Sequence, residues 1–329
     1  MTTPSRLPTP SYISSRPSQR PSQRPSQRPS HRPGPAGRQV LPKPFIKWVG
    51  GKTQLLSELL SRAPARFGGY HEPFMGGGAL FFALQRAGRL YEREVHLSDV
   101  NRELVETYLG VRDQSERVIR LLADHPYDKD HYYQVREQNP FALGTSALAA
   151  RFIYLNRSGF NGLYRVNKSG GFNVPFGRYT NPTICDADNL RAAAKALRNA
   201  NIHNGSFETV LARAERGDFV YFDPPYVPVS QTSNFVGYAK GGFDLSMQEK
   251  LARTFEKLAA KGVYVMLSNS EAPWVKERFS DFKQHIVSAR RNVNSKAGKR
   301  GPVGELIVTS YDPRELAREA SVRPAPARG

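Results

Sequence analysis

The sequence predicts an α/β protein built on a mostly parallel β-sheet. Short apolar runs typical of buried strands alternate with helix-spaced apolar segments in both halves of the body. This alternation is typical of strands joined by helical crossovers. Two of the strands run into loops rich in glycine or proline, at the position where such sheets bind ligands. A long stretch without regular periodicity separates the halves, so we expect an insertion within one sheet.

In the first half of the body, the pattern predicts a helix, a strand, a glycine turn, a second helix and a second strand. The first helix begins at Thr53 and stops near Pro64, because leucines recur on one face until the proline. The strand 70–73 runs into a glycine-rich turn, and the apolar run 79–82 then starts the second helix. The second strand, 94–99, ends in an acidic residue.

In the second half, buried strands are predicted at 218–222 and 262–267. The helix between them is expected to begin at a capping box, in which Ser246 caps the first turn and Glu249 follows three residues later. This helix runs to about Ala260.

Two further regions do not follow the alternation. Residues 102–184 look helical at first and then become rich in asparagine, glycine, arginine and aromatic residues, which predicts the insertion. From about Arg314 the sequence carries few structural signals, and we expect a C-terminal tail there.

The N-terminal residues 1–43 carry seven arginines, one lysine and no acid. Between Arg16 and Gln27 they repeat Arg-Pro-Ser-Gln three times, and proline at every fourth position excludes a helix. Because almost nothing in this tail is apolar, it is expected to be disordered. We interpret it mainly as a solvated linker, with the alternative of an arm that adds affinity for nucleic-acid phosphates.

Composition restricts the classes of partner. The formal net charge is +19 over 329 residues, and about +11 of it belongs to the body beyond the tail. Such an excess of lysine and arginine indicates a polyanion, most often nucleic acid, with an acidic membrane surface as the alternative. A single cysteine, Cys185, excludes an internal disulfide and suits a reducing compartment. No apolar run approaches the roughly 20 residues of a membrane span.

The segment 45–56, FIKWVGGKTQLL, contains the run Gly-Gly-Lys-Thr, which resembles the end of a phosphate-binding loop. Such a loop needs a glycine five positions before its last glycine, so that backbone N–H groups can wrap the phosphates. That position is Ile46 here, and a branched side chain prevents the wrap. The sequence therefore argues against an ATP site and leaves Lys52 for another ligand.

The glycine turn after the first strand lets a ligand approach the backbone at a helix N-terminus. Asp99 follows Gly78 by 21 residues, near the spacing at which an acid accepts hydrogen bonds from ribose hydroxyls. The third glycine of the dinucleotide fingerprint is absent, so a nucleoside without a pyrophosphate fits as well or better. S-adenosylmethionine is such a ligand, and Lys52 is placed to pair with its carboxylate.

The tetrapeptide Asp223-Pro224-Pro225-Tyr226 follows a buried strand at the carboxyl edge of the sheet. The prolines fix the Asp223 carboxylate and the Pro224 carbonyl as two acceptors for one amino group, beside a tyrosine ring. This arrangement suits an exocyclic amine on a flat base, and positioning it against an activated methyl supplies most of the catalysis. A base in a duplex must first be flipped out, at a cost of a few kcal/mol. The alternative is a tight turn with a packed tyrosine.

Six segments, in order, resemble the Dam-type DNA adenine-N6 methyltransferases: PFIKWVGGK, EPFMGGG, LSDVN, YLNRSGFNGLYR, FNVPFGRY and DPPY. The resemblance extends from about Lys43 to Tyr311. It implies a Rossmann-like S-adenosylmethionine-dependent methyltransferase fold with an inserted, largely helical DNA target-recognition domain. The implied catalytic domain has two parts, 44–101 and 186–312. The target-recognition domain, 102–185, is inserted between them, and the tails 1–43 and 313–329 flank the whole.

The resemblance also implies roles for individual residues. Methyl transfer is assigned to Asp223, Pro224, Pro225 and Tyr226. The S-adenosylmethionine pocket is assigned to Trp48, Lys52, Pro73, Phe74, Gly76, Gly78, Asp99 and Asp223. Contacts with duplex DNA, whose usual site in the family is GATC, are assigned to Lys47, Phe160, Asn161, Leu163, Arg165, Pro175, Arg178 and Tyr179.

The chemistry of these side chains fits those roles. Arg165 can donate to guanine O6 and N7, and Phe160 can fill the gap left by a flipped adenine. Leu163 and Pro175 can meet a thymine methyl, with loop packing as the alternative, and Arg178 can instead contact a phosphate. The family often has tyrosine at the position of Phe160. The basic segment 290–300 fits a hairpin that clamps DNA, although charge runs are usually solvated.

Several alternatives remain at this point. An N4-cytosine methyltransferase would favour serine in place of Asp223, and RNA as substrate would leave the major-groove role of Arg165 unused. An inactive DNA-binding regulator would be expected to lose the glycine turn or the tetrapeptide. A modification enzyme paired with a restriction nuclease would use another site. We expect a cytoplasmic, nucleoid-associated monomer that binds duplex DNA, without a metal or a membrane partner.

Overall fold

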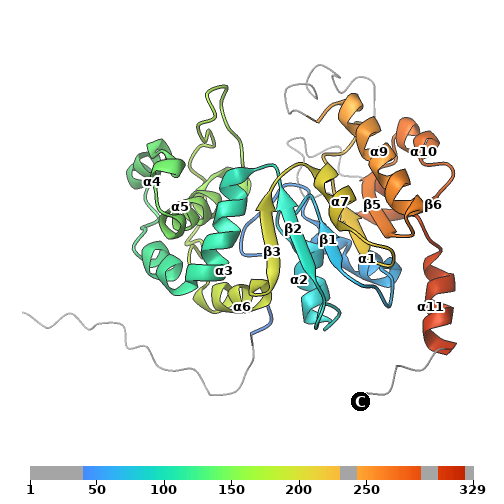
Figure 1. Cartoon of the computed structure of the whole chain (residues 1–329). Helices are drawn as coiled ribbons and strands as arrows, with labels where there is room; N and C mark the ends of the chain where they lie inside the picture. The colour runs from blue at the N-terminus through green and yellow to red at the C-terminus, as the bar shows by residue number, and fades with distance from the viewer. Residues whose placement is uncertain (1–39, 230–242, 290–302, 323–329) are drawn as a thin grey trace, which may run out of the picture. The chain divides into compact units, whose positions relative to one another are not determined.

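A central β-sheet of seven strands organises the described part of the computed structural model, which comprises residues 40–229, 243–289 and 303–322 (Figure 1). The strand order is β3-β2-β1-β4-β5-β7-β6. Strands β1 to β5 pair in parallel, and β7 runs antiparallel to β5 and β6. The strands are β1 Tyr70–Glu72, β2 Val95–Asp99, β3 Ala200–Asn204, β4 Phe219–Phe222, β5 Tyr264–Ser270, β6 Lys283–Ala289 and β7 Val303–Thr309.

This sheet confirms the predicted α/β fold of the Rossmann-like methyltransferase type, with a mostly parallel sheet. The order 3-2-1-4-5 reverses direction between β1 and β4, and a ligand crevice is expected outside the carboxyl ends of the strands at such a point. All residues of β1 and β4 are buried, as is typical of parallel strands covered on both faces. The α-helices are α1 Leu56–Arg62, α2 Ala79–Arg86, α3 Arg102–Ala123, α4 Lys129–Glu137, α5 Thr145–Ser158, α6 Ala187–Leu197, α7 Val210–Arg213, α9 Leu245–Ala260, α10 Pro273–Arg278 and α11 Pro313–Val322.

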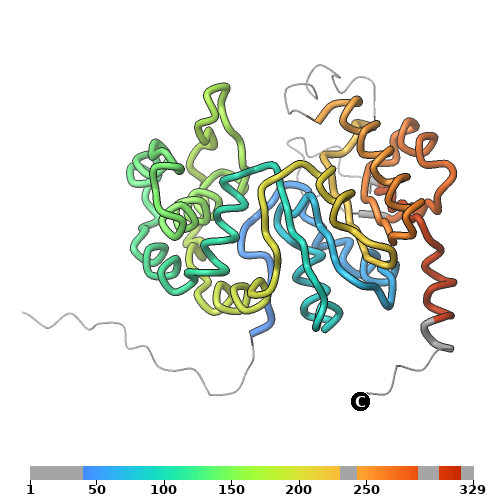
Figure 2. The backbone as a smooth tube through the Cα atoms, viewed as in Figure 1, coloured from blue at the N-terminus to red at the C-terminus, as the bar shows by residue number. Residues whose placement is uncertain are grey.

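Helices α3, α4 and α5 follow β2 in the range where the sequence predicts an insertion, and β3 comes only after them. A hairpin follows, closed by the antiparallel bridges Gly159–Phe176 and Val166–Phe172, and we call it the 159–176 hairpin. Figure 2 shows this yellow-green segment projecting beyond the helices that precede it. Helix α6 then leads back to the sheet.

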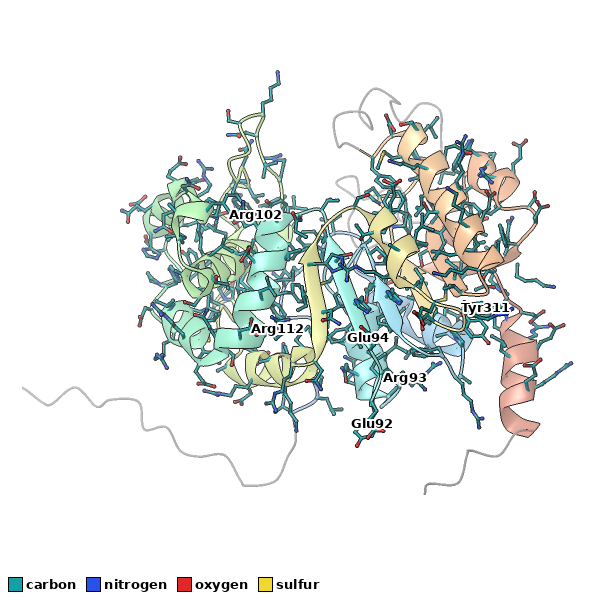
Figure 3. The ribbon with its side chains drawn as sticks, viewed as in Figure 1. Glu92, Arg93, Glu94, Arg102, Arg112 and Tyr311 are labelled. Carbon is teal, nitrogen blue, oxygen red and sulfur yellow. The ribbon has the colours of Figure 1, made fainter. Side chains whose placement is uncertain are left out.

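Helix α3 connects the insertion to the sheet. It packs against β2, β3 and α5. Arg112 from α3 donates a hydrogen bond to the carbonyl of Ala200 at the start of β3 (2.9 Å), while its other nitrogens pair with the neighbouring Asp113 (Figure 3). Helix α3 therefore packs both on the sheet and on the helices that follow it.

A buried ion pair holds the inserted helices together. Arg151 of α5 lies 2.6 Å from Glu103 of α3, and both side chains are almost fully buried. The guanidinium also donates to the carbonyls of Val135 and Arg136 at the end of α4. The second carboxylate oxygen of Glu103 accepts from the hydroxyl of Tyr164 (3.1 Å) in the hairpin. The pair therefore connects α3, α5, the end of α4 and the hairpin.

Two expectations about helix ends were wrong. The N-cap of α9 is Asp244, whose carboxylate accepts from the backbone N–H of Met247 (3.0 Å), and Ser246 instead donates to Asp244. Aspartate and serine are comparable caps, and the backbone here makes Leu245 the first helical residue. The predicted end near Ala260 is confirmed. The first helix is also shorter than predicted, because a 3-10 turn at Lys52–Gln54 precedes α1.

The structure replaces part of the expected C-terminal tail with helix α11, Pro313–Val322. Pro313 occupies the first position, where its missing N–H costs nothing, and Asp312 accepts from the N–H of Arg314 (2.8 Å). These two signals were present in the sequence and were missed. The expectations for the tail residues 1–39 and for the basic segment 290–300 lie outside the described residues.

Glu72 at the end of β1 leads to a prediction about pH. It is fully buried, accepts from Tyr70 (2.8 Å) and from the N–H of Phe81 (3.2 Å), and burial raises its pKa from 4.5 to about 8. Between these two pH values, Glu72 is protonated in the folded state and ionised in the unfolded chain. Raising the pH therefore favours the unfolded chain, and the free energy of unfolding falls. Relative to Glu72→Gln, the free energy of unfolding of the wild type should fall by up to about 1.4 kcal/mol per pH unit from about pH 5 to 8.

Denaturant unfolding of both proteins across this pH range tests the prediction. The glutamine keeps an acceptor for Tyr70 and Phe81 but does not titrate. A difference between the two proteins that stays constant with pH would show that Glu72 is ionised in the folded state.

Candidate active site

The tetrapeptide Asp223–Tyr226 follows β4 directly, at the carboxyl edge of the sheet and beside the strand that carries the glycine turn. The Asp223 carboxylate lies 2.8 Å from the ammonium of Lys52, which is 5% exposed. Lys52 also donates to the carbonyl of Gly50 and lies 4.8 Å from the centre of the Tyr226 ring. The positive φ of Gly50, 79°, turns the chain so that this lysine reaches the edge. Lys52, Asp223 and Tyr226 therefore form one cluster.

The backbone around the tetrapeptide is held from β5 and α9. Gln248 donates to the carbonyl of Pro225 (2.7 Å), and Asn269 accepts from the N–H of Val227 (3.0 Å). Asn269 in turn donates to Gln248 (3.3 Å). Within the part of the chain that the structure describes, no group donates to the carbonyl of Pro224 or to the second oxygen of Asp223. Among these residues, both oxygens keep lone pairs for a further donor.

Tyr226 is oriented by Glu305 on β7. Its hydroxyl donates to the Glu305 carboxylate at 2.7 Å. Burial raises the pKa of Tyr226 well above its usual value, and the charges of Asp223 and Glu305 act in the same direction. Burial likewise raises the pKa of Asp223, whereas the Lys52 ammonium opposes this rise. The tyrosine therefore stays neutral and presents its ring at a fixed angle beside the two acceptors.

We expect Tyr226→Phe to lower kcat about tenfold with little change in the affinity for DNA. The ring remains, but the hydrogen bond to a carboxylate, worth about 1.5–3 kcal/mol, is lost. Steady-state kinetics with a methylatable duplex test this, and Tyr91→Phe, which changes an exposed tyrosine, is the control. Equal kcat in Tyr226→Phe and wild type would mean that the hydroxyl does not set the position of the ring.

The glycine turn brings the other predicted pocket residues together. The N–H of Gly76 donates to Asp99 at 3.1 Å, and the N–H of Asn101 donates to its other oxygen at 2.9 Å. Burial raises the pKa of Asp99, and these N–H bonds counteract it. Gly76 (φ 47°) lies under the indole of Trp48, so close that an added Cβ would be 2.7 Å from the ring. A side chain at this position would displace Trp48.

The remaining pocket residues form the walls of the turn. Gly78 has a φ of 63° and caps α2. Phe74 stacks on Phe207 with ring centres 5.4 Å apart, in a cluster that also includes Phe222 and Phe243. Of the predicted cofactor residues, Trp48 and Asp99 contact the glycine turn directly, whereas Lys52 contacts the tetrapeptide.

The 159–176 hairpin carries most of the residues predicted to contact DNA. Phe160 is 45% exposed, and its N–H donates to the carbonyl of Pro175 on the opposite arm (2.9 Å). Asn161 adopts a left-handed φ of 54°. The exposed guanidinium of Arg165 donates to the carbonyl of Asn173 (3.1 Å through Nε). The hairpin therefore presents an aromatic ring, an amide and a guanidinium to solvent.

The other predicted DNA contacts lie at the base of the hairpin. The ammonium of Lys47 lies 4.0 Å above the ring of Tyr179, whose hydroxyl donates to the carbonyl of Gly159 (3.1 Å). Arg178 is exposed and Leu163 is partly exposed. Lys47 comes from the segment that also carries Trp48 and Lys52, so one stretch of chain reaches both clusters.

Sequence reasoning missed the residues that hold the site from a distance. Glu305 and Gln248 contact the tetrapeptide, Asn269 contacts Val227 directly after it, and Asn156 contacts the segment of Lys47. Only Asn156 lies in one of the six motif segments, and no role was assigned to it there. The only available signal was polar residues within otherwise apolar strands, such as Asn269 in β5.

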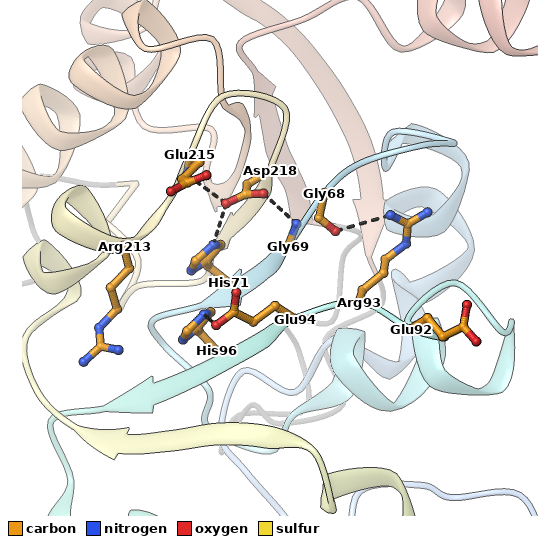
Figure 4. Close-up of a pocket in the computed structure, with 10 residues that line it drawn as sticks. All are labelled: Gly68, Gly69, His71, Glu92, Arg93, Glu94, His96, Arg213, Glu215 and Asp218. Atoms are coloured by element: carbon orange, nitrogen blue, oxygen red, sulfur yellow. Dashed lines mark hydrogen bonds and ion pairs between the residues drawn. The ribbon is translucent and has the colours of Figure 1, made fainter.

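A polar cavity of about 610 Å³ lies at the other edge of the sheet, where β1, β2 and β4 begin (Figure 4). Two of its carboxylates lie against histidines, Asp218 beside His71 and Glu94 beside His96. Asp218 accepts from the N–H groups of Gly69 and Glu215 (2.6 and 2.8 Å) and lies 3.1 Å from His71, which stacks on His96. No predicted site residue lines this cavity. Asp218 connects the turn before β4 to β1 and so aligns the two central strands.

No group of three or more histidine, cysteine, aspartate or glutamate side chains in the described ranges is arranged to hold a metal ion. Among the same residues, no helix is both long and apolar enough to cross a bilayer.

The strand order reverses between β1 and β4, and the candidate site lies at the carboxyl ends of these strands. Together with the mostly parallel sheet, this defines an enzyme of the Rossmann-like methyltransferase class. The family of D12 class N6 adenine-specific DNA methyltransferases matches residues 48–293. The chain belongs to this family.

Curated relatives are similar over most of their length. A type II methyltransferase of Lactococcus lactis subsp. cremoris, M1.LlaDCHI, is 41% identical over 277 residues, covering 82% of this chain and 95% of that protein. The type II methyltransferase M.MjaIII of Methanocaldococcus jannaschii is 40% identical over 290 residues, covering 82% and 99%. The DNA adenine methylase of Escherichia coli K12 is 35% identical over 267 residues, covering 80% and 93%.

Proposed function

We propose that this adenine-specific DNA methyltransferase transfers the methyl group of S-adenosylmethionine to N6 of an adenine flipped out of duplex DNA, within the site GATC. The observation that carries the proposal is that two adjacent parallel strands end in the two groups of the site: β4 in the tetrapeptide with its oriented tyrosine, and β1 in the glycine turn that binds Asp99. The residue pattern of the whole recognition segment supports GATC as the site.

The residues at the glycine turn fit S-adenosylmethionine. Asp99 keeps lone pairs for ribose hydroxyls, and Trp48 offers an indole face beside Gly76. When bound, this cofactor supplies a methyl group already activated by a sulfonium. Lys52 is paired with Asp223, so we propose that its ammonium is shared between Asp223 and the cofactor carboxylate. The pocket is completed by Pro73, Phe74 and Gly78.

At the transfer site, the chain's own groups hold the base. The Asp223 carboxylate and the Pro224 carbonyl accept the two N–H groups of the adenine amine, which localises the nitrogen lone pair and aims it at the methyl carbon. The Tyr226 ring stacks on the base and returns part of the cost of flipping, since stacking is worth about 1–3 kcal/mol. Positioning is the main source of rate acceleration in this arrangement.

The hairpin residues are proposed to read the duplex. Phe160 fills the gap left by the adenine, Arg165 donates to a guanine, and Leu163 meets a thymine methyl. Asn161, Pro175, Arg178, Tyr179 and Lys47 complete the proposed surface. We also propose that the enzyme acts as a monomer.

Labelled S-adenosylmethionine and a set of duplexes test the function. One duplex contains GATC, and each of the others has one base of the site replaced. Methyl on adenine N6 of the GATC duplex alone supports the proposal. Transfer to adenine in another sequence would overturn the site but keep the reaction, and no transfer despite tight binding would favour a DNA-binding regulator.

Arg165→Ala is expected to weaken discrimination at one guanine position. A bidentate contact between arginine and guanine is worth about 1–3 kcal/mol, so the preference in kcat/KM for guanine over other bases there should fall roughly 5- to 150-fold. Lys168→Ala, which removes a cation from the exposed end of the same hairpin, is the control. Unchanged preference at every position would exclude Arg165 from base recognition.

A further inference from the structure

Asn156, near the end of α5, lies where the 159–176 hairpin meets the segment that carries Lys52. Its side-chain oxygen accepts from the N–H of Lys47 (2.7 Å). Its amide nitrogen donates to the carbonyl of Lys47 (2.8 Å) and to that of Gly162 (3.0 Å). The residue is 2% exposed. Its whole amide is therefore occupied by two backbone segments that have no hydrogen bond of their own to each other.

Each of these segments carries a different part of the site. On one side, Lys47 precedes Trp48, which packs on the glycine turn, and the chain then reaches Lys52 and its partner Asp223. On the other side, Gly162 lies in the turn that presents Phe160 to solvent. Asn156 thus connects the turn of Phe160 with the segment that carries Lys52 through hydrogen bonds to both.

The two segments are also in close contact. Gly162 has a φ of 62°, and a Cβ added there would lie 2.5 Å from the Cβ of Lys47. Tyr164, two residues on, stacks on Trp48 with ring centres 5.8 Å apart. The hydrogen bonds of Asn156 therefore fix a junction that already leaves no room for a side chain.

We propose that Asn156 is a positioning residue for DNA recognition, which acts by holding the Phe160–Gly162 turn in register with the Lys47–Lys52 segment. This inference rests on the proposed function of those residues and deepens it. Without the amide, Lys47 and Gly162 lose the partner that sets their separation, so the recognition turn moves relative to the transfer site. The consequence is a loss of discrimination between DNA sites that exceeds the loss of stability.

The chain provides a closely matched control in Asn189 of α6. This asparagine is fully buried, accepts from the N–H of Lys43 (3.0 Å) and donates to the carbonyl of Lys43 (3.1 Å). It makes the same pair of bonds to the same N-terminal segment, four residues upstream. It does not hydrogen-bond to the hairpin. Asn189→Ala therefore removes the same pair of bonds to the N-terminal segment, one bond fewer than Asn156→Ala, without touching the junction.

The experiment compares both variants with the wild type on the wild type's own methylation site, whichever sequence that is. Dissociation constants, KM and kcat are measured for this duplex and for duplexes with one base replaced, together with the free energy of unfolding. We expect Asn156→Ala to lose at least roughly tenfold in discrimination, mainly through KM and the dissociation constant. Asn189→Ala should stay within about twofold of the wild type in discrimination, with a similar loss of stability.

A second pair of variants keeps the test decisive if Asn156→Ala does not fold. Gly162→Ala pushes on Lys47 from the other side of the junction, whereas Gly170→Ala imposes a similar backbone strain (φ 80°) at a position with open space around it. We expect Gly162→Ala to lose discrimination and Gly170→Ala to keep it.

Equal discrimination in both members of each pair, or wild-type discrimination in Asn156→Ala, would overturn the proposal. If the wild type transferred no methyl to any duplex, the proposed function would fail instead. The dissociation constants would still decide the role of Asn156, because they require no turnover.

Discussion

Asp223→Asn is expected to lower methyl transfer by at least roughly 100-fold, the effect of removing one well-placed polar group from a reacting centre. Asparagine keeps the shape of the side chain but replaces one acceptor oxygen with a donor. The new amide either faces Lys52, which stood 2.8 Å from the carboxylate, or faces the adenine amine that the carboxylate should accept. Initial rates with labelled S-adenosylmethionine at saturating duplex measure the change.

The same substitution leaves Lys52 without its ion-pair partner at a nearly buried position. A loss of stability must therefore be separated from a loss of chemistry, by measuring binding to DNA and unfolding beside the rate. Asp281→Asn, which changes an exposed aspartate, is the control. A variant that binds DNA normally and turns over at the wild-type rate would exclude Asp223 from catalysis.

Glu103→Ala is expected to destabilise the protein by about 3–5 kcal/mol. It leaves the buried Arg151 guanidinium without a counter-charge, and breaking a buried pair from one side costs about this much. It also removes the acceptor of the Tyr164 hydroxyl. Chemical denaturation measures the effect, and the insertion should become accessible to protease before the sheet does.

Two comparisons identify the cause. Glu103→Leu combined with Arg151→Met should recover much of the loss, since both charges are then absent. Glu116→Gln breaks an exposed pair with Arg191 and should cost no more than about 1 kcal/mol. If the double variant were less stable than Glu103→Ala, unpaired charge would not be the source of the destabilisation.

Local patterns were sufficient for the central part of the fold. The buried run before Asp223 and the turn around Gly76 were predicted from residue type alone, because strand periodicity and glycine turns depend on neighbours in sequence. The capping error at Ser246 shows the limit of this reasoning. Asp244 and Ser246 both suit a cap, and only the backbone decides which of them accepts the bond from Met247.

The supports of the site were beyond prediction for a different reason. Glu305 is 79 residues from Tyr226, and Asn156 is 109 residues from Lys47. Such pairs depend on strand order and on the return path of the insertion, which no local window contains. Even the partner of Lys52 was not predicted. The sequence suggested a cofactor carboxylate, whereas the folded chain pairs this lysine with Asp223.

The separation of β1 from its neighbour β4 has a consequence for synthesis on the ribosome. Gly69 and Asp218 are bonded across 149 residues of sequence, and β1 cannot acquire this neighbour before β4 has been translated. At about 5–20 residues per second, the interval is roughly 7–30 s, plus the time for the chain to leave the exit tunnel. Throughout it, the side of β1 that later pairs with β4 has no partner, so the two central strands of the sheet can join only late in synthesis.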